Sequence, residues 1–270
     1  MRSMLTAFTI VALMAAVAWT EEPAAPASAE AQLKAAYAVK KQSHGKEGEE
    51  KRQILLAAVA AYAEVGVRFP EDKEGCATAA FRIGEIQRSI GEAAAAEKAF
   101  QEVLVHGSPE DLVARALLEL GHLKRREKEL ERAIDLYGQV ARQCPGARKR
   151  GATALLWIAK CHRSLKSWND ARTTLRTILE DYIDEPRSVI SAYDLIAATY
   201  LDESNVALAE ETLMECRERF QRLEADGGEF AGMTARVEKL KSWKRLATMK
   251  QASMKQATPK QDPSKGASDE

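Results

Sequence analysis

The stretch from Ala114 to Pro145, ARALLELGHLKRREKELERAIDLYGQVARQCP, contains two apolar patterns at helical spacing with a charged break between them. The apolar residues are Leu117, Leu120 and Gly121 in the first segment and Ala133, Tyr137 and Val140 in the second. The charged residues 126–129 separate the two segments. Pro145 follows the second one, where proline ends a helix because it cannot continue the hydrogen-bond pattern. The stretch therefore predicts a hairpin of two helices.

The same hairpin pattern recurs along the chain at a nearly constant period. The small residue that opens the second helix recurs at Ala58, Ala96, Ala133, Ala171 and Ala209, in steps of 38, 37, 38 and 38 residues. Four residues later stand Tyr62, Phe100, Tyr137, Leu175 and Leu213, and three beyond those stand Val65, Val103, Val140, Ile178 and Cys216. Twelve residues before the anchor stand Gly84, Gly121, Ala159 and Ala197, whereas the first unit has Lys46 there. Such a period predicts stacked helical hairpins.

Small residues and prolines support this prediction. We expect Gly121 and Ala133 to let the two helices of one hairpin approach closely, with Tyr137 and Leu120 filling the space toward the next hairpin. The prolines between residues 30 and 250 each follow the second helix of a unit, and they are Pro70, Pro109, Pro145 and Pro186. Because Lys46 replaces the small residue, we expect the first hairpin to be irregular, as terminal repeats often are.

This pattern resembles the tetratricopeptide repeat. The matching residues are Leu120, Gly121, Ala133, Tyr137 and Pro145 in the third unit and Ile83, Gly84, Gly91, Ala96 and Phe100 in the second. The units lack the family's tryptophan at its usual place, and their period is a few residues longer than the family's. The longer spacing is similar to the periplasmic branch, which includes outer-membrane assembly lipoproteins and the Tol-Pal-associated coordinator.

The resemblance covers residues 50 to 220 and carries more information on fold than on function. It implies an all-α, right-handed α-α superhelix of five helical hairpins over residues 29–224. Phe230, Met233, Val237, Leu240, Trp243 and Leu246 share a helical face, so we expect one further helix from Glu229 to Met254, a capping helix over residues 228–255. The alternative for this helix, which carries several lysines beside Trp243, is binding to a membrane surface or a partner. Residues 256–270 are expected to be disordered.

The N-terminus has the pattern of a secretory signal. Arg2 precedes an apolar run from Met4 to Ala18 that ends in a small-x-small site. We predict a signal peptide over residues 1–18 and a flexible spacer over residues 19–28, with an uncleaved membrane anchor as the alternative. No cysteine follows the run, so the lipid attachment of the assembly lipoproteins is not expected. The predicted location is periplasmic or otherwise exported, with no direct membrane insertion after cleavage.

Composition and motifs argue against several functions. The chain has 40 basic and 40 acidic residues, so no global charge draws it to nucleic acid. It lacks the phosphate-binding, zinc-protease and nucleophile-elbow motifs. Cys161 and His162 do not form a haem-attachment motif, because Ile158 stands where the first cysteine is needed. We expect no enzyme activity, no cofactor and no metal. The spacing of the four cysteines predicts free, mostly buried thiols.

The first helices of the hairpins are expected to line a concave groove. The predicted groove residues are Phe81, Arg88, Arg115, Leu118, His122, Arg125, Arg126, Leu156, Lys160 and Arg163, and the fifth unit adds Ser191, Asp194, Ala198, Leu201 and Asp202. The middle of this groove is basic in a neutral chain, which favours an acidic ligand. The family's carboxylate clamp needs Lys and Asn where this chain has Phe81, Leu118 and Glu85, so recognition of a terminal carboxylate is not implied.

Two functions remain possible at this point. In the first, an exported scaffold binds an acidic, extended segment of a protein partner, with Arg88, Arg125, Lys160 and Arg163 as charge partners. A row of Phe81, Leu118 and Leu156 would form its apolar floor. In the alternative, these arginines are ordinary surface residues and the apolar row packs on the next hairpin. The chain would then be a structural component of a cell-envelope assembly, held through its ends and its basic C-terminal helix.

Overall fold

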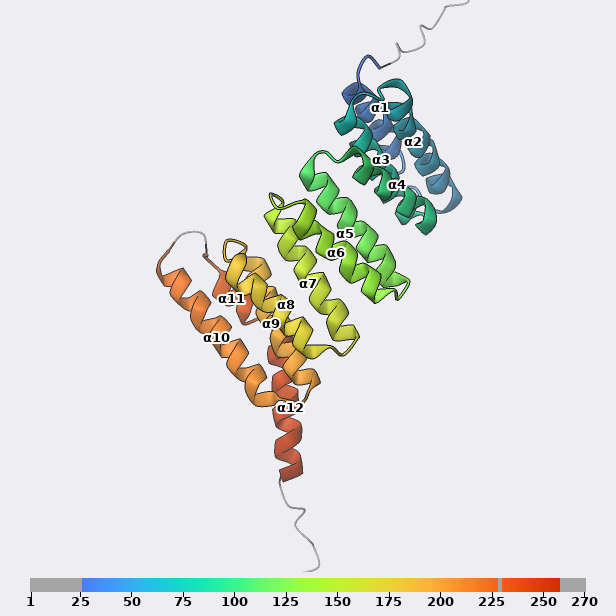
Figure 1. Ribbon diagram of the computed structural model, residues 1–270. Helices are drawn as coiled ribbons and strands as arrows, with labels where there is room; N and C mark the ends of the chain where they lie inside the picture. The colour runs from blue at the N-terminus through green and yellow to red at the C-terminus, as the bar shows by residue number, and fades with distance from the viewer. Residues whose placement is uncertain (1–25, 228–229, 258–270) are drawn as a thin grey trace, which may run out of the picture.

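The computed structural model describes residues 26–227 and 230–257, and this part of the chain contains helices and no strand (Figure 1). The helices are α1 (Ala29–Lys41), α2 (Gly48–Arg68), α3 (Lys73–Ser89), α4 (Ala93–His106), α5 (Glu110–Arg126), α6 (Leu130–Gln143), α7 (Arg148–Ser164), α8 (Trp168–Asp181), α9 (Pro186–Asp202), α10 (Val206–Ala225), α11 (Met233–Val237) and α12 (Lys241–Ala257). None of these described helices has the length and apolar character needed to cross a membrane. The predicted all-α class is confirmed.

Ten of the helices form five hairpins that follow one another in space (Figure 1). Each helix from α1 to α9 contacts the next one along the chain, and first helices also contact each other across one position, as α5 does with α7 and α7 with α9. Each hairpin therefore contacts mainly the hairpins next to it in the sequence, which is the arrangement of a solenoid. The five predicted hairpins are confirmed.

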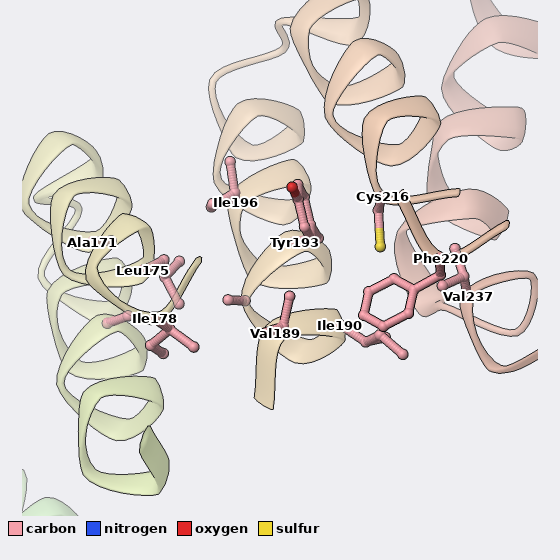
Figure 2. Packing of buried hydrophobic residues seen from close by; sticks show 12 residues of the cluster. Ala171, Leu175, Ile178, Val189, Ile190, Tyr193, Ile196, Cys216, Phe220 and Val237 are labelled. Atoms are coloured by element: carbon pink, nitrogen blue, oxygen red, sulfur yellow. The ribbon is translucent and has the colours of Figure 1, made fainter. Parts of the chain in front are cut away.

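The repeated apolar positions form the core, because each hairpin buries them against its neighbour. The anchors Ala58, Ala96, Ala133, Ala171 and Ala209 are all fully buried. The bulky residues four positions later are buried as well, and so are the residues seven positions later. Figure 2 shows one such cluster, in which Leu175 of α8 faces one side of α9 and Phe220 of α10 faces the other. The four cysteines are free and buried, as predicted.

The glycines of the first helices make room for aromatic rings within the same hairpin. A Cβ atom at Gly84 would lie 2.6 Å from the Phe100 ring, and one at Gly121 would overlap the Tyr137 ring. Tyr137 also packs in the cluster that contains Ala154 and Ile158 of the next hairpin, as predicted. The missing side chain of Gly121 leaves the space for that ring inside the hairpin.

The first hairpin is irregular, as predicted. α1 ends at Lys41, and Lys46 lies in the long turn before α2. The fully buried Ala36 supplies a small residue in the core that contains Ala58 and Tyr62. The side chain of Ser28 caps α1 by accepting a hydrogen bond from the Ala31 N–H at 3.2 Å. The predicted signal peptide, most of the spacer and residues 258–270 of the tail lie outside the described residues.

The C-terminal segment contains two helices where one was predicted. The chain breaks between α11 and α12 because their buried residues join different parts of the core. Val237 packs in the cluster that contains Phe220, whereas Leu246 packs in the cluster that contains Leu213. The indole N–H of Trp243 donates to the carbonyl oxygen of Val237 at 3.1 Å and so satisfies the end of α11. α12 contacts α9 and α10, the place that a first helix of a further hairpin would take.

Candidate functional site

A cavity of about 750 Å³ lies between α7, α9 and the C-terminal segment, and we name it the C-terminal groove. Its lining residues are Leu156, Lys160, Arg163, Ser191, Asp194, Leu195, Ala198, Arg236, Lys239, Leu240, Lys241, Ser242 and Arg245. The residues from α7 and α9 include positions that the repeat pattern placed on the concave wall. The residues from α12 form a further wall, which the repeat pattern did not place there.

The C-terminal groove carries an excess of positive charge. Its cationic side chains are Lys160, Arg163, Arg236, Lys239, Lys241 and Arg245, and its only lining carboxylate is Asp194. Asp194 is already engaged, because its Oδ1 accepts a hydrogen bond from the Ser242 N–H at 3.0 Å. Among the described residues, no ion pair involves Lys160, Arg236, Lys239 or Lys241, although the chain as a whole is neutral. Charge of one sign in a concave surface attracts ligands of the opposite sign.

Asp202 holds two of these cations and thereby fixes α12. Its carboxylate accepts hydrogen bonds from Arg163 at 2.5 Å and 3.2 Å and forms an ion pair with Arg245 at 2.6 Å. Burial alone would raise the pKa of Asp202, but the hydrogen bonds from the two arginines outweigh it and lower the pKa. Arg245 comes from α12 and Arg163 from α7, so one carboxylate on α9 joins both walls of the groove.

One predicted charge partner, Arg88, and one further predicted groove residue, Arg115, are neutralised by neighbouring hairpins. Arg88 pairs with Glu119 at 3.3 Å, and Arg115 pairs with Glu85 at 3.6 Å. Both pairs join α3 to α5 across the concave wall. Glu119 does not stand at a predicted groove position, so the repeat pattern did not predict that it neutralises Arg88.

The predicted apolar floor is wrong for two of its three residues. Phe81 is 2% exposed and Leu118 is 6% exposed, because both pack in the core between hairpins. The guanidinium of Arg115 also covers Phe81, with its Cζ 4.2 Å from the ring centroid. A peptide cannot reach these side chains without opening the hairpins. Leu156 is half-buried and does line the C-terminal groove.

Three of the predicted residues, His122, Arg125 and Lys160, meet at an aromatic side chain that the sequence pattern did not single out. We name Trp157, His122, Arg125 and Lys160 the Trp157 cluster. The Arg125 Cζ lies 4.6 Å and the Lys160 Nζ 3.9 Å from the indole centroid, and the His122 ring packs edge-on at 4.7 Å. Trp157 stands two residues before Ala159. The other units have Arg82, Glu119 and Leu195 at this repeat position. The aromatic residue in one unit alone was the sequence signal that could have pointed to this cluster.

Burial and neighbouring cations keep His122 uncharged in the Trp157 cluster. Desolvation, followed by the charges of Arg125 and Arg126, lowers the pKa of His122 to about 4. Its Nδ1 lies 2.6 Å from the Tyr137 hydroxyl, whose own pKa is raised, chiefly by burial. The hydroxyl therefore stays protonated, and the tautomer of the neutral ring sets which of the two groups donates the hydrogen bond. Arg126 is exposed and forms no ion pair among the described residues.

Comparisons with known proteins agree with this architecture. Residues 153–182 match the family model described as tetratricopeptide repeat, a segment that runs from α7 through α8. No curated protein matches the sequence. The tetratricopeptide resemblance is therefore supported directly for the hairpin that carries Trp157 and Lys160. A link to the periplasmic branch stays a prediction.

The solved structures with a similar fold include RapI and a putative kinesin light chain. The apo form of RapI superposes with a TM-score of 0.57 at 15% identity, over 85% of this chain and 65% of RapI. A putative kinesin light chain from Podosopora anserina, with nearly identical tetratricopeptide-like repeats, superposes with a TM-score of 0.51 at 11% identity, over 75% of this chain and 99% of the other. These likenesses define the class of fold as a tetratricopeptide-like solenoid.

Proposed function

We propose that this protein is an exported, non-catalytic scaffold that binds an acidic, extended segment of a protein partner in the C-terminal groove. The observation that carries the proposal is the concentration of positive charge in a concave cavity of a neutral chain. Lys160, Lys239 and Lys241 have no carboxylate partner among the described residues, so a ligand carboxylate would gain attraction without breaking an internal ion pair.

The groove also supplies the apolar contacts that an extended segment needs. Leu156, Leu195 and Leu240 line it beside the charges. Pockets that bind ligands combine an apolar lining with a few placed polar groups, and this groove has that composition. A segment that alternates acidic and apolar side chains would match the two kinds of wall residue.

A pair of substitutions on one helix tests the proposal. Lys241 lines the groove, whereas Lys244 is exposed on the same helix and does not line it. Lys241→Glu and Lys244→Glu change the net charge equally. The probe is a fluorescein-labelled peptide that alternates glutamate and leucine, with a glutamine version as its control. Fluorescence anisotropy at low and high salt measures the dissociation constant.

We expect Lys241→Glu to weaken binding about tenfold at low salt, or ~1.4 kcal/mol, and less at high salt because ions screen the charges. Lys244→Glu should bind like the unaltered protein, and the glutamine peptide should bind weakly to all three. The substitution should leave the fold intact, because glutamate is favourable in the first turn of a helix. Equal effects of the two substitutions, or equal binding of both peptides, would contradict the proposed groove.

The Lys241→Glu and Lys244→Glu variants also distinguish groove binding from the second candidate function. In that function the protein is a structural component of a cell-envelope assembly, held through the basic C-terminal helix. This candidate keeps support because α12 extends past the body of the solenoid (Figure 1). Deleting residues from Glu229 onward does not separate the two functions, since it also removes the groove wall at Lys241 and Arg245. In retrieval of a partner from the exported fraction, loss with Lys244→Glu alone favours the assembly function.

A further inference from the structure

The Trp157 cluster holds two cations against one indole ring without a counter-charge. The Arg125 Cζ and the Lys160 Nζ both lie within 4.6 Å of the ring centroid. Among the described residues neither side chain forms an ion pair, whereas Arg88, Arg115 and Arg163 at neighbouring concave positions each pair with a carboxylate. Attraction to the indole face offsets only part of the repulsion between two such cations.

The groups in this cluster retain unused capacity for an anionic ligand. The Arg125 Nε is buried and has no hydrogen-bond partner among the described residues. Burial, followed by the charge of Arg125, lowers the pKa of Lys160, which shows that the surroundings disfavour its charged form. An anion beside the Arg125 guanidinium and the Lys160 ammonium would relieve the repulsion between them. The neutral His122 ring adds a packing surface and no charge.

The cluster is continuous with the C-terminal groove through Lys160. Its side chain lines the groove and also contacts Trp157. A segment that lies in the groove and runs toward α5 would therefore pass the indole next. Figure 1 shows α5, α7 and α9 following one another, so the path crosses successive hairpins.

We propose that the Trp157 cluster is a carboxylate subsite, in which one Asp or Glu side chain of the bound segment lies between the Arg125 guanidinium and the Lys160 ammonium. The inference rests on the proposed function of the groove and names one contact within it. Guanidinium presents paired N–H donors that match the geometry of a carboxylate, and the ammonium adds a second charge. Trp157 positions both cations.

A double-mutant cycle between protein and peptide tests this contact. The protein variants are Arg125→Gln and Lys160→Met, which remove the charge and keep much of the side-chain length. Arg126→Gln is the matched control, because it removes the same charge from the adjacent exposed residue. The probe is the glutamate–leucine peptide, in which each glutamate is replaced in turn by glutamine. The measured quantity is the dissociation constant of each combination.

We expect Arg125→Gln and Lys160→Met each to raise the dissociation constant of the glutamate peptide about tenfold. One glutamine-substituted peptide should bind both variants and the unaltered protein equally, because its missing carboxylate is the one that the subsite holds. Arg126→Gln should show no coupling to that position. Absence of coupling at every peptide position would overturn the subsite, while continued sensitivity to Lys241→Glu would leave the groove function standing.

A second measurement does not depend on the peptide. In nuclear magnetic resonance spectra, sodium acetate should shift the indole N–H resonance of Trp157 at concentrations where sodium chloride does not. The shift should disappear in Arg125→Gln, and circular dichroism should show that this variant is folded. An equal response to both salts, or a response that persists in the variant, would show that the two cations only support the indole.

Discussion

At the residue scale, packing in this solenoid depends on positions where a side chain is missing. Gly121 illustrates this best, because the Tyr137 ring occupies the space that a Cβ atom would take. The ring is fully buried there, and its hydroxyl reaches His122. The glycine that lets the two helices pack closely therefore also places the Tyr137 hydroxyl beside the Trp157 cluster. The structural core and the candidate site share this residue.

Gly121→Ala should destabilise the protein by about 1–3 kcal/mol, because overpacking forces the Tyr137 ring or the helices to move. Gly66→Ala is the control. Gly66 is exposed in α2 and has no neighbour within 4 Å of the added Cβ, so alanine should stabilise its helix by roughly 0.5–1 kcal/mol. Urea unfolding followed by circular dichroism measures both. A higher midpoint for Gly121→Ala would show that the ring is not confined.

The turns between the two helices of a hairpin have a backbone conformation that the residue pattern predicts in only one unit. One backbone position is left-handed in four successive hairpins, at Gly91, Lys128, Lys166 and Ser204, with φ between 61° and 87°. Only the first of these is a glycine, the residue that adopts this conformation without strain. The sequence therefore marks the turn in one hairpin, while the stacking of helices imposes it in the other three.

At the scale of elements, the groove depends on how α12 is held. Asp202 on α9 binds Arg163 of α7 and Arg245 of α12, and Asp194 on α9 binds the start of α12 through Ser242. Replacement of either carboxylate changes both the charge of the groove and the stability of its wall. The apolar contacts of Leu246 would keep the helix nearby.

We expect Asp202→Asn to increase hydrogen exchange of the α12 amides about tenfold, or ~1.4 kcal/mol of opening free energy, because a single neutral amide oxygen replaces the carboxylate that pairs with both arginines. Asp184→Asn is the control, since Asp184 pairs with Arg148 far along the chain from α12 and should leave this exchange unchanged. Mass spectrometry of the exchanging protein measures both variants. Equal exchange in α12 for the two variants would mean that Asp202 does not hold the helix.

At the scale of the whole molecule, the charge carried by the first helices of the hairpins changes along the solenoid. This charge is neutralised where α3 meets α5, and it is positive where α7 meets α9 and α12. A net charge of zero conceals this difference. A ligand with negative charge would therefore bind at the C-terminal half and leave the first two hairpins free for other contacts.

The proposed export of the molecule has a direct measurement. If the apolar run before Trp19 is a cleaved signal, N-terminal sequencing of the protein from the producing cells should begin near Trp19. Fractionation should place this mature form outside the cytoplasm. Recovery of Met1 from a membrane fraction would instead favour an uncleaved anchor, and recovery of Met1 from the cytoplasm would contradict export.

The repeat period was sufficient to predict the hairpins and most of the core. Ala58, Ala96 and Ala133 are buried as expected, because a helix of fixed geometry brings every residue at the same repeat position to the same interface. The buried cysteines follow from the same rule. The break between α11 and α12 lay outside this rule, because no second copy of that segment exists to define its pattern.

The sequence by itself determined the fold class, the register of the hairpins and several cations of the concave wall. Only the tertiary structure decided which cations keep their charge available. Glu119 neutralises Arg88 and Asp202 holds Arg163, whereas Arg125 and Lys160 meet at Trp157 without a carboxylate. The physical reason is that local periodicity specifies which face of a helix a residue occupies. The charges opposite that face come from other hairpins, and their distances depend on how the hairpins stack.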